Sequence, residues 1–153
     1  MAYDRADFDY SSDELPLPKG HAGTHIGMFL AWAVLNGLEN EFHRQRSAHL
    51  LASLRAREIT GRTLFEKICE GKFSERDLSP EGNAFAAFYY KNEAGERGQY
   101  FEDYKRTLAH HLPSFWSVED TWANYDKLAP VLTHRLEEWK NPRPRKRWWQ
   151  FWK

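Results

Sequence analysis

The sequence predicts an all-α fold, a single compact domain of five to seven helices around a buried central helix at about residues 24–40, with irregular arms at both ends. Two observations favour this class. The segment 26–38 is apolar on nearly every side, which is typical of a helix buried in a core. The remaining chain shows apolar residues at spacings of three and four, and no alternating run bounded by turns that would predict a strand.

The central segment THIGMFLAWAVLNGLENE has the local signals of a packed helix. Thr24 is a suitable N-cap. Gly27 and Ala31 lie four residues apart, so they leave room for another helix to approach closely. The apolar run of about a dozen residues is too short to span a bilayer, which requires roughly 20. One face combines polar and aromatic residues: His25, Phe29, Trp32, Asn36 and Glu39.

Four further start signals predict the helices that follow. Ser47 and Thr60 precede apolar-periodic segments, Ser79 precedes a proline and an acid, and Ser117 precedes Val-Glu-Asp. Another helix is expected before Pro113. We expect an interruption or a kink at Pro130, since proline removes a hydrogen bond inside a helix. The residues expected to face the core include Leu51, Leu54, Leu64, Phe65, Cys69, Phe85, Phe88, Tyr89, Phe101, Tyr104, Leu108, Leu132 and Leu136.

Charge divides the chain into three parts. We expect an acidic extended arm at 1–20, a helical domain at 21–140 and a basic aromatic tail at 141–153. The formal net charge of the whole chain is zero, so the asymmetry indicates tails with different partners rather than a charged fold. Cys69, the single cysteine, indicates a core residue in a reducing compartment. The N-terminal segment lacks a secretory apolar region, which favours a cytoplasmic location.

Three segments carry a resemblance to a known family. THIGMFLAWAVLNGLENE near the start, GKFSERDLSPEGNAFAAFYY in the middle and VEDTWANYDKLAPVLTHR near the end are similar to an uncharacterised bacterial family, a domain of unknown function. The resemblance covers roughly residues 20–139. It implies a bacterial cytoplasmic protein of about this size, and it supplies no activity, cofactor or catalytic residue.

Chemical motifs are sparse. The sequence has no phosphate-binding or dinucleotide-binding glycine motif, no nucleophile elbow and no predicted cofactor. His21 and His25 have the spacing of a helical zinc pair, but no glutamate follows His21 as in zinc proteases, so they are weak metal candidates. A polar cluster could form where the central helix meets Asp120, Asn124 and Asp126, and it would serve either acid-base chemistry or helix register.

The C-terminal tail is the strongest surface signal. Cations next to indole rings are typical of segments that contact anionic membrane surfaces. Single-stranded nucleic acid is a less favoured ligand, and folding of the tail onto the domain is the alternative. The residues expected to contact the membrane are Arg143, Arg145, Lys146, Arg147, Trp148, Trp149, Phe151 and Trp152.

These observations favour a non-catalytic protein-binding protein, most specifically an immunity protein that neutralises a bacterial toxin. Many aromatic and acidic residues are available for an interface of the kind that tight complexes use. The alternatives are a membrane-surface adaptor at the inner membrane that docks through the tail, and a helical enzyme or metal-binding protein that uses the polar face. The expected partner contacts are Glu39, Glu41, Asp120, Asn124 and Asp126.

Overall fold

The computed structural model describes residues 2–6, 21–92 and 94–142. This part is a mostly helical compact domain, as predicted, with one antiparallel pair of strands that the sequence analysis did not expect. The helices are α1 (Thr24–Leu35), α2 (Glu41–Arg46), α3 (Ala48–Arg55), α4 (Gly61–Ile68), α5 (Pro80–Tyr89), α6 (Gln99–Tyr104) and α7 (Trp122–Lys140), and the strands are β1 (Ala2–Arg5) and β2 (Lys72–Ser74). Single helical turns are η2 (His21–Gly23), η3 (Glu75–Asp77) and η5 (Phe115–Ser117), and α6 continues as a π-helical segment, η4 (Lys105–Ala109).

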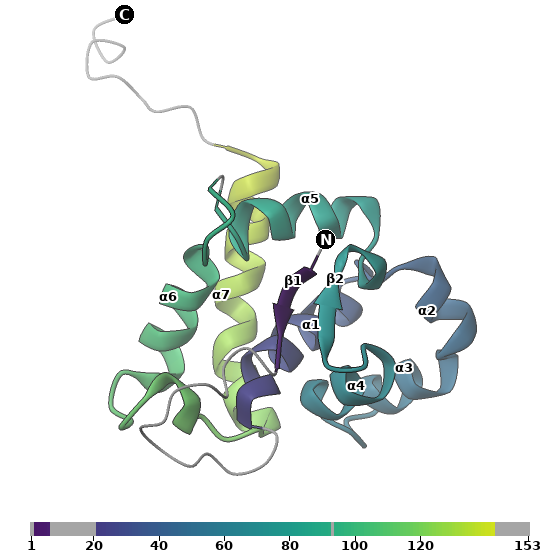
Figure 1. Ribbon diagram of the computed structural model, residues 1–153, viewed down its shortest axis with the longest axis horizontal. Helices are drawn as coiled ribbons and strands as arrows, with labels where there is room; N and C mark the ends of the chain where they lie inside the picture. The colour runs from purple at the N-terminus through teal and green to yellow at the C-terminus, as the bar shows by residue number, and fades with distance from the viewer. Residues whose placement is uncertain (1, 7–20, 93, 143–153) are drawn as a thin grey trace, which may run out of the picture.

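Helix α1 lies at the centre of the molecule, behind the two strands (Figure 1). Helices α6 and α7 lie to one side of it, α2, α3 and α4 lie to the other, and α5 crosses one end. Every residue of α1 except Leu35 is buried, which confirms the predicted central helix. It ends earlier than expected, because Gly37 adopts a left-handed conformation (φ 71°).

The closest helix pair is α1 against the start of α4. A side chain at Gly27 would overlap the backbone of Arg62, and a side chain at Gly61 would overlap the carbonyl of Gly27. The predicted close approach at Gly27 is therefore confirmed. Two glycines facing each other let the backbones meet without intervening side chains.

The expected absence of strands is wrong for residues 2–5 and 72–74. Ala2 pairs with Ser74 and Arg5 with Lys72, with an irregular register between Ala2 and Asp4. Tyr3 of β1 is buried, and the centroid of its ring lies 5.2 Å from the centroid of the Phe73 ring. Such short strands, far apart in the chain, carry no local alternation that a sequence could display.

Helix caps were predicted with mixed success. The hydroxyls of Thr60 and Ser79 accept hydrogen bonds from backbone amides in the first turns of α4 and α5, as expected. Ser47 precedes α3 but makes no side-chain cap bond. The start at Ser117 is wrong, because Thr121 caps α7 instead. Helix α7 runs through Pro130 as a single element, so of the two expected outcomes the interruption does not occur, and the kink stays a prediction.

Candidate functional site

Helix α5 is apolar on two faces. Its inner stripe of Gly82, Phe85, Ala86 and Tyr89 is buried, with residues at the three- and four-residue spacing of one helix face. The Phe85 ring packs against Trp32 of α1 and Trp139 of α7, both 5.5 Å away between centroids. One side of this surface helix is therefore fully part of the core.

The outer face of α5 is exposed and remains apolar. Ala84, Ala87 and Phe88 are exposed, and Phe88 has the largest exposed fraction of the large hydrophobic residues that the structure describes, 62%. The expectation that Phe88 is buried is wrong. It precedes Tyr89 by one residue, and one residue turns a helix by about 100°, which carries its side chain out of the buried stripe.

A hollow of about 400 Å³ lies beside this face. Ala84 and Ala87 form part of its lining, together with Tyr3 of β1 and Lys91 of the following loop. The Tyr3 hydroxyl donates a hydrogen bond to Asn83 Oδ1 over 2.8 Å, which fixes one wall. Burial, and secondarily the nearby charge of Glu75, raises the pKa of Tyr3 to about 12, so this wall is uncharged at neutral pH. Polar groups thus surround a mainly apolar floor.

The predicted partner contacts Glu39 and Glu41 lie at the start of α2. Glu39 is buried, and its carboxylate accepts hydrogen bonds from Arg44 Nε (3.0 Å) and Arg55 Nη2 (3.4 Å). Glu41 is exposed and also pairs with Arg44, at 3.3 Å. These arginines join α2 and α3 to the end of α1, so both acids already have partners within the domain.

The other three predicted contacts lie at the start of α7. Asp120 Oδ2 accepts a hydrogen bond from Thr60 Oγ1 over 2.6 Å, and Asp126 forms a two-pronged pair with Arg57 at 2.7 and 2.9 Å. Asn124 donates to a backbone carbonyl in the turn before α7. Asp120 and Asp126 tie α7 to the turn between α3 and α4. The structure places them apart from the Glu39 group, at different helix ends, and their role in partner binding stays a prediction.

His21 and His25 do not converge on one point. His21 lies in η2, where its Nδ1 is 2.9 Å from the carbonyl oxygen of Trp116. His25 is buried in α1, and its Nε2 lies 2.9 Å from Asp4 Oδ2. Burial opposes the charge of Asp4, but hydrogen bonds from His25 and Tyr90 outweigh it and lower the pKa of that carboxyl. This pair joins β1 to α1.

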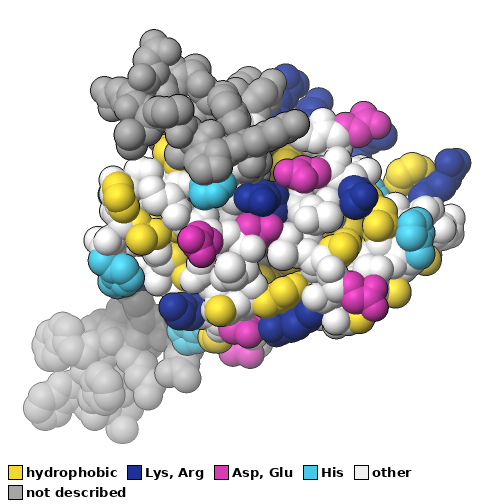
Figure 2. Space-filling model, turned by 90° about the horizontal axis from the view of Figure 1, so that it is seen from below, with side chains coloured by type: hydrophobic (Ala, Val, Ile, Leu, Met, Phe, Trp, Pro, Cys, Tyr) yellow, Lys and Arg dark blue, Asp and Glu magenta, His cyan; other side chains and the backbone are white. Residues whose placement is uncertain are grey.

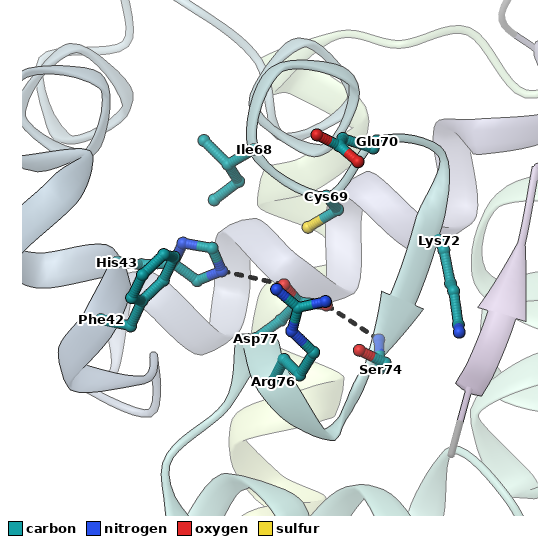
Figure 3. Close-up of a pocket in the computed structure, with 9 residues that line it drawn as sticks. All are labelled: Phe42, His43, Ile68, Cys69, Glu70, Lys72, Ser74, Arg76 and Asp77. Atoms are coloured by element: carbon teal, nitrogen blue, oxygen red, sulfur yellow. Dashed lines mark hydrogen bonds and ion pairs between the residues drawn. The ribbon is translucent and has the colours of Figure 1, made fainter.

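A second buried imidazole lies in an open hollow of about 330 Å³ (Figure 3). His43 of α2, Cys69 after α4 and Asp77 at the end of η3 point toward one another. His43 Nε2 lies 2.8 Å from Asp77 Oδ1, and the backbone amide of Ser74 donates to Asp77 Oδ2 over 2.8 Å. Burial, and secondarily the charge of Asp77, raises the pKa of the Cys69 thiol, which keeps it protonated in this arrangement.

Sequence reasoning missed this cluster for a physical reason. Cys69 is buried as predicted, but its neighbours come from separate elements, and His43 and Asp77 share no short spacing with it. The one local signal was the Ser74 to Asp77 spacing, which forms a capping box around η3. That signal predicts a turn and not a cluster.

Two predicted segments lie outside the described residues. They are 7–20 of the acidic arm and 143–153, which holds all eight expected membrane contacts. No described helix combines the length and apolar character needed to cross a membrane. On the face shown in Figure 2, basic side chains are interspersed with acidic and apolar ones and form no continuous stripe.

These features define a small helical domain with an apolar helix face that the described residues leave uncovered and a buried polar cluster. The chain belongs to the family described as Domain of unknown function (DUF7832), whose model matches residues 2–118. The match includes β1 and ends before α7, so it starts and stops earlier than the resemblance seen in the sequence. No curated protein and no solved structure matches the chain.

Proposed function

We propose that the protein is a non-catalytic protein-binding domain that docks a partner protein on the outer face of α5. One observation carries the proposal: from Ala84 to Tyr89, α5 is apolar on both faces, and the described residues cover only one of them. A surface helix normally turns charged or polar residues to solvent. Ala84, Ala87 and Phe88 leave no such residue in the middle of the outer face.

The chemistry of this face suits an aromatic contact at the centre of an interface. Burying a phenylalanine side chain fully is worth about 1.5–3 kcal/mol, and Phe88 has most of its surface available for this. The hollow on the same side of α5 is lined in part by Ala84 and Ala87, so it accepts an apolar side chain from the partner. Interfaces whose central contacts are apolar and whose rim is polar match this arrangement.

The partner is therefore a protein that presents an aliphatic or aromatic side chain to the hollow and covers Phe88. Neutralisation of a toxin by an immunity protein is the most specific case, because such a protein works by occluding a surface and needs no catalytic group of its own.

A photo-crosslinking experiment tests the proposal. A photoreactive amino acid replaces Phe88 in the full chain, and in a matched control it replaces Phe42, which is 50% exposed on α2. We expect the probe at position 88, and not at 42, to crosslink one protein in the native cell. Crosslinks from position 88 only to the protein's own chain would contradict the proposal, since they would mean that the protein covers the face itself.

The captured protein is then purified and its affinity is measured against three forms of the domain. Phe88→Ser should weaken binding about 30-fold or more, the effect of losing a central aromatic contact worth about 2 kcal/mol. Phe42→Ser should bind as the unaltered protein does. Equal affinity of Phe88→Ser and the unaltered chain would remove the outer face of α5 as the docking surface.

A further inference from the structure

Three side chains with metal-binding atoms meet in the hollow shown in Figure 3. They are the imidazole of His43, the thiol of Cys69 and the carboxylate of Asp77, and one donor atom of each lies within 4.8 Å of the others. All three residues are more than nine-tenths buried. We infer that they form a binding site for Zn²⁺ or a similar divalent transition-metal ion, a property independent of the surface on α5.

One pair of ligand atoms already lies near the separation that a bound ion requires. Tetrahedral zinc at about 2.0–2.1 Å from nitrogen and oxygen and 2.3 Å from sulfur holds its ligand atoms roughly 3.3–3.7 Å apart. His43 Nε2 and Asp77 Oδ1 are 2.8 Å apart, so they need to separate by only about half an ångström. The Ser74 amide bond to Oδ2 holds the carboxylate with Oδ1 turned toward the imidazole. Such outer contacts orient ligands in known metal sites.

Coordination disturbs little else in the protein. The other ring nitrogen of His43, Nδ1, is buried without a hydrogen-bond partner in the described structure, so binding through Nε2 breaks the bond to Asp77 and leaves Nδ1 as it is. The Cys69 thiol also gives up its hydrogen bond to Asp77. When Zn²⁺ binds to Nε2 of the neutral imidazole, the His43 ring carries its proton on Nδ1 and the Cys69 thiol releases its proton to solvent. The dication is then balanced by one thiolate and one carboxylate, and one proton leaves the protein for each ion bound.

The donor set selects the kind of ion. Thiolate and imidazole favour zinc and related transition metals over Mg²⁺ and Ca²⁺, which take oxygen ligands. Three protein ligands leave a fourth position, and all three residues line a hollow of about 330 Å³. Water or a small exogenous ligand completes the coordination there.

Titration of the full, untagged and reduced protein with Co²⁺ tests the site, with Zn²⁺ as the competitor. We expect one Co²⁺ per chain, a thiolate-to-cobalt charge-transfer band in the near ultraviolet, loss of that band on adding Zn²⁺, and release of about one proton per Zn²⁺. A protein that shows no charge-transfer band with stoichiometric Co²⁺ overturns the inference without any variant.

Variants then identify the ligands. Cys69→Ser should abolish the charge-transfer band, and His43→Gln and Asp77→Asn should each weaken Zn²⁺ binding about 100-fold or more, since loss of an outer contact alone costs 10–100-fold. Gln and Asn keep hydrogen-bonding groups, and circular dichroism checks their fold. His25→Gln alters the other buried histidine–aspartate pair, and His49→Gln alters an exposed histidine; both should bind Zn²⁺ as the unaltered protein does. Unchanged affinity of a folded His43→Gln would overturn the assignment.

Discussion

Asp103 is the most completely buried acid in the described structure, and it tests how burial sets the contribution of an ion pair to the free energy of unfolding. Its exposed fraction is 0%, and its carboxylate accepts hydrogen bonds from Tyr89 over 2.6 Å and Gln99 over 3.1 Å. Arg135 of α7 approaches it with Nε at 2.8 Å and Nη2 at 3.1 Å, and Arg106 adds a bond of 2.7 Å. This network joins α5, α6 and α7 around one charge.

We predict that Arg135 contributes much more than Arg106 to the free energy of unfolding. Arg135→Met keeps the aliphatic part of the side chain but removes the guanidinium, which is bidentate and belongs to a side chain only 30% exposed. The buried negative charge of Asp103 then has fewer hydrogen bonds and less opposite charge beside it. Breaking such a pair costs 3–5 kcal/mol, and the bonds that remain place the loss at about 3 kcal/mol. Arg106→Met removes a side chain that is 68% exposed, so its loss should stay below about 1 kcal/mol.

Urea denaturation at pH 7, followed by circular dichroism, measures both losses. In thermal unfolding, the Arg135→Met loss corresponds to a fall of about 6–12 °C in Tm for a chain of this size. The double-variant cycle with Asp103→Asn should recover much of the Arg135 effect, because the charge that needs compensation is gone. Equal losses for the two arginine variants would refute the argument that burial sets the contribution of each pair.

Three further predictions address the fold and the tail. Gly61→Ala should destabilise the protein by about 3 kcal/mol in urea unfolding, since the added methyl would overlap the backbone at Gly27 and force α1 and α4 apart; an unchanged midpoint would contradict this. The pKa of the Asp103 carboxyl is lowered because its hydrogen bonds outweigh the effect of burial. Its contribution to the free energy of unfolding should therefore be complete above the unfolded-state pKa of about 3.9, and it should be lost as the pH falls through the lower native pKa. In urea unfolding between pH 6 and 3, the free energy of unfolding of Asp103→Asn should change less with pH than that of the unaltered protein. Removing 143–153 should abolish co-sedimentation with anionic vesicles, as the tail's composition predicts, and unchanged sedimentation would exclude the tail as the membrane contact.

Local physics explains which parts of the fold the sequence could predict. An N-cap needs only a hydroxyl and the amides within the next turn, so Thr60 and Ser79 identified the starts of α4 and α5. Gly27 also indicated a close helix approach, because only a missing side chain permits one. The β1–β2 pair depends instead on residues some 70 positions apart, as Ala2 and Ser74 are. Strands of four and three residues are too short for their sequences to specify which segment pairs with them.

The candidate sites were hidden for two different reasons. His43, Cys69 and Asp77 come together only because helix α2, the end of helix α4 and the turn η3 fold against one another, so no sequence spacing marks them. The exposure of Phe88 could not be predicted because every position in AFAAFYY is apolar, so hydrophobic periodicity does not indicate which face of the helix is buried. The buried face is the one that carries Phe85, because Trp32 and Trp139 pack against that ring.

Helices α1 and α5 follow the same sequence rule with different outcomes. A helix that is apolar on all sides is expected to be buried on all sides. In α1 the rule holds, because strands and helices surround it (Figure 1). In α5 the domain covers the stripe of Phe85 and Tyr89 and leaves Phe88 in solvent. The apolar outer face of α5 contributes nothing to the described core, so a contact outside that core best explains why it is apolar.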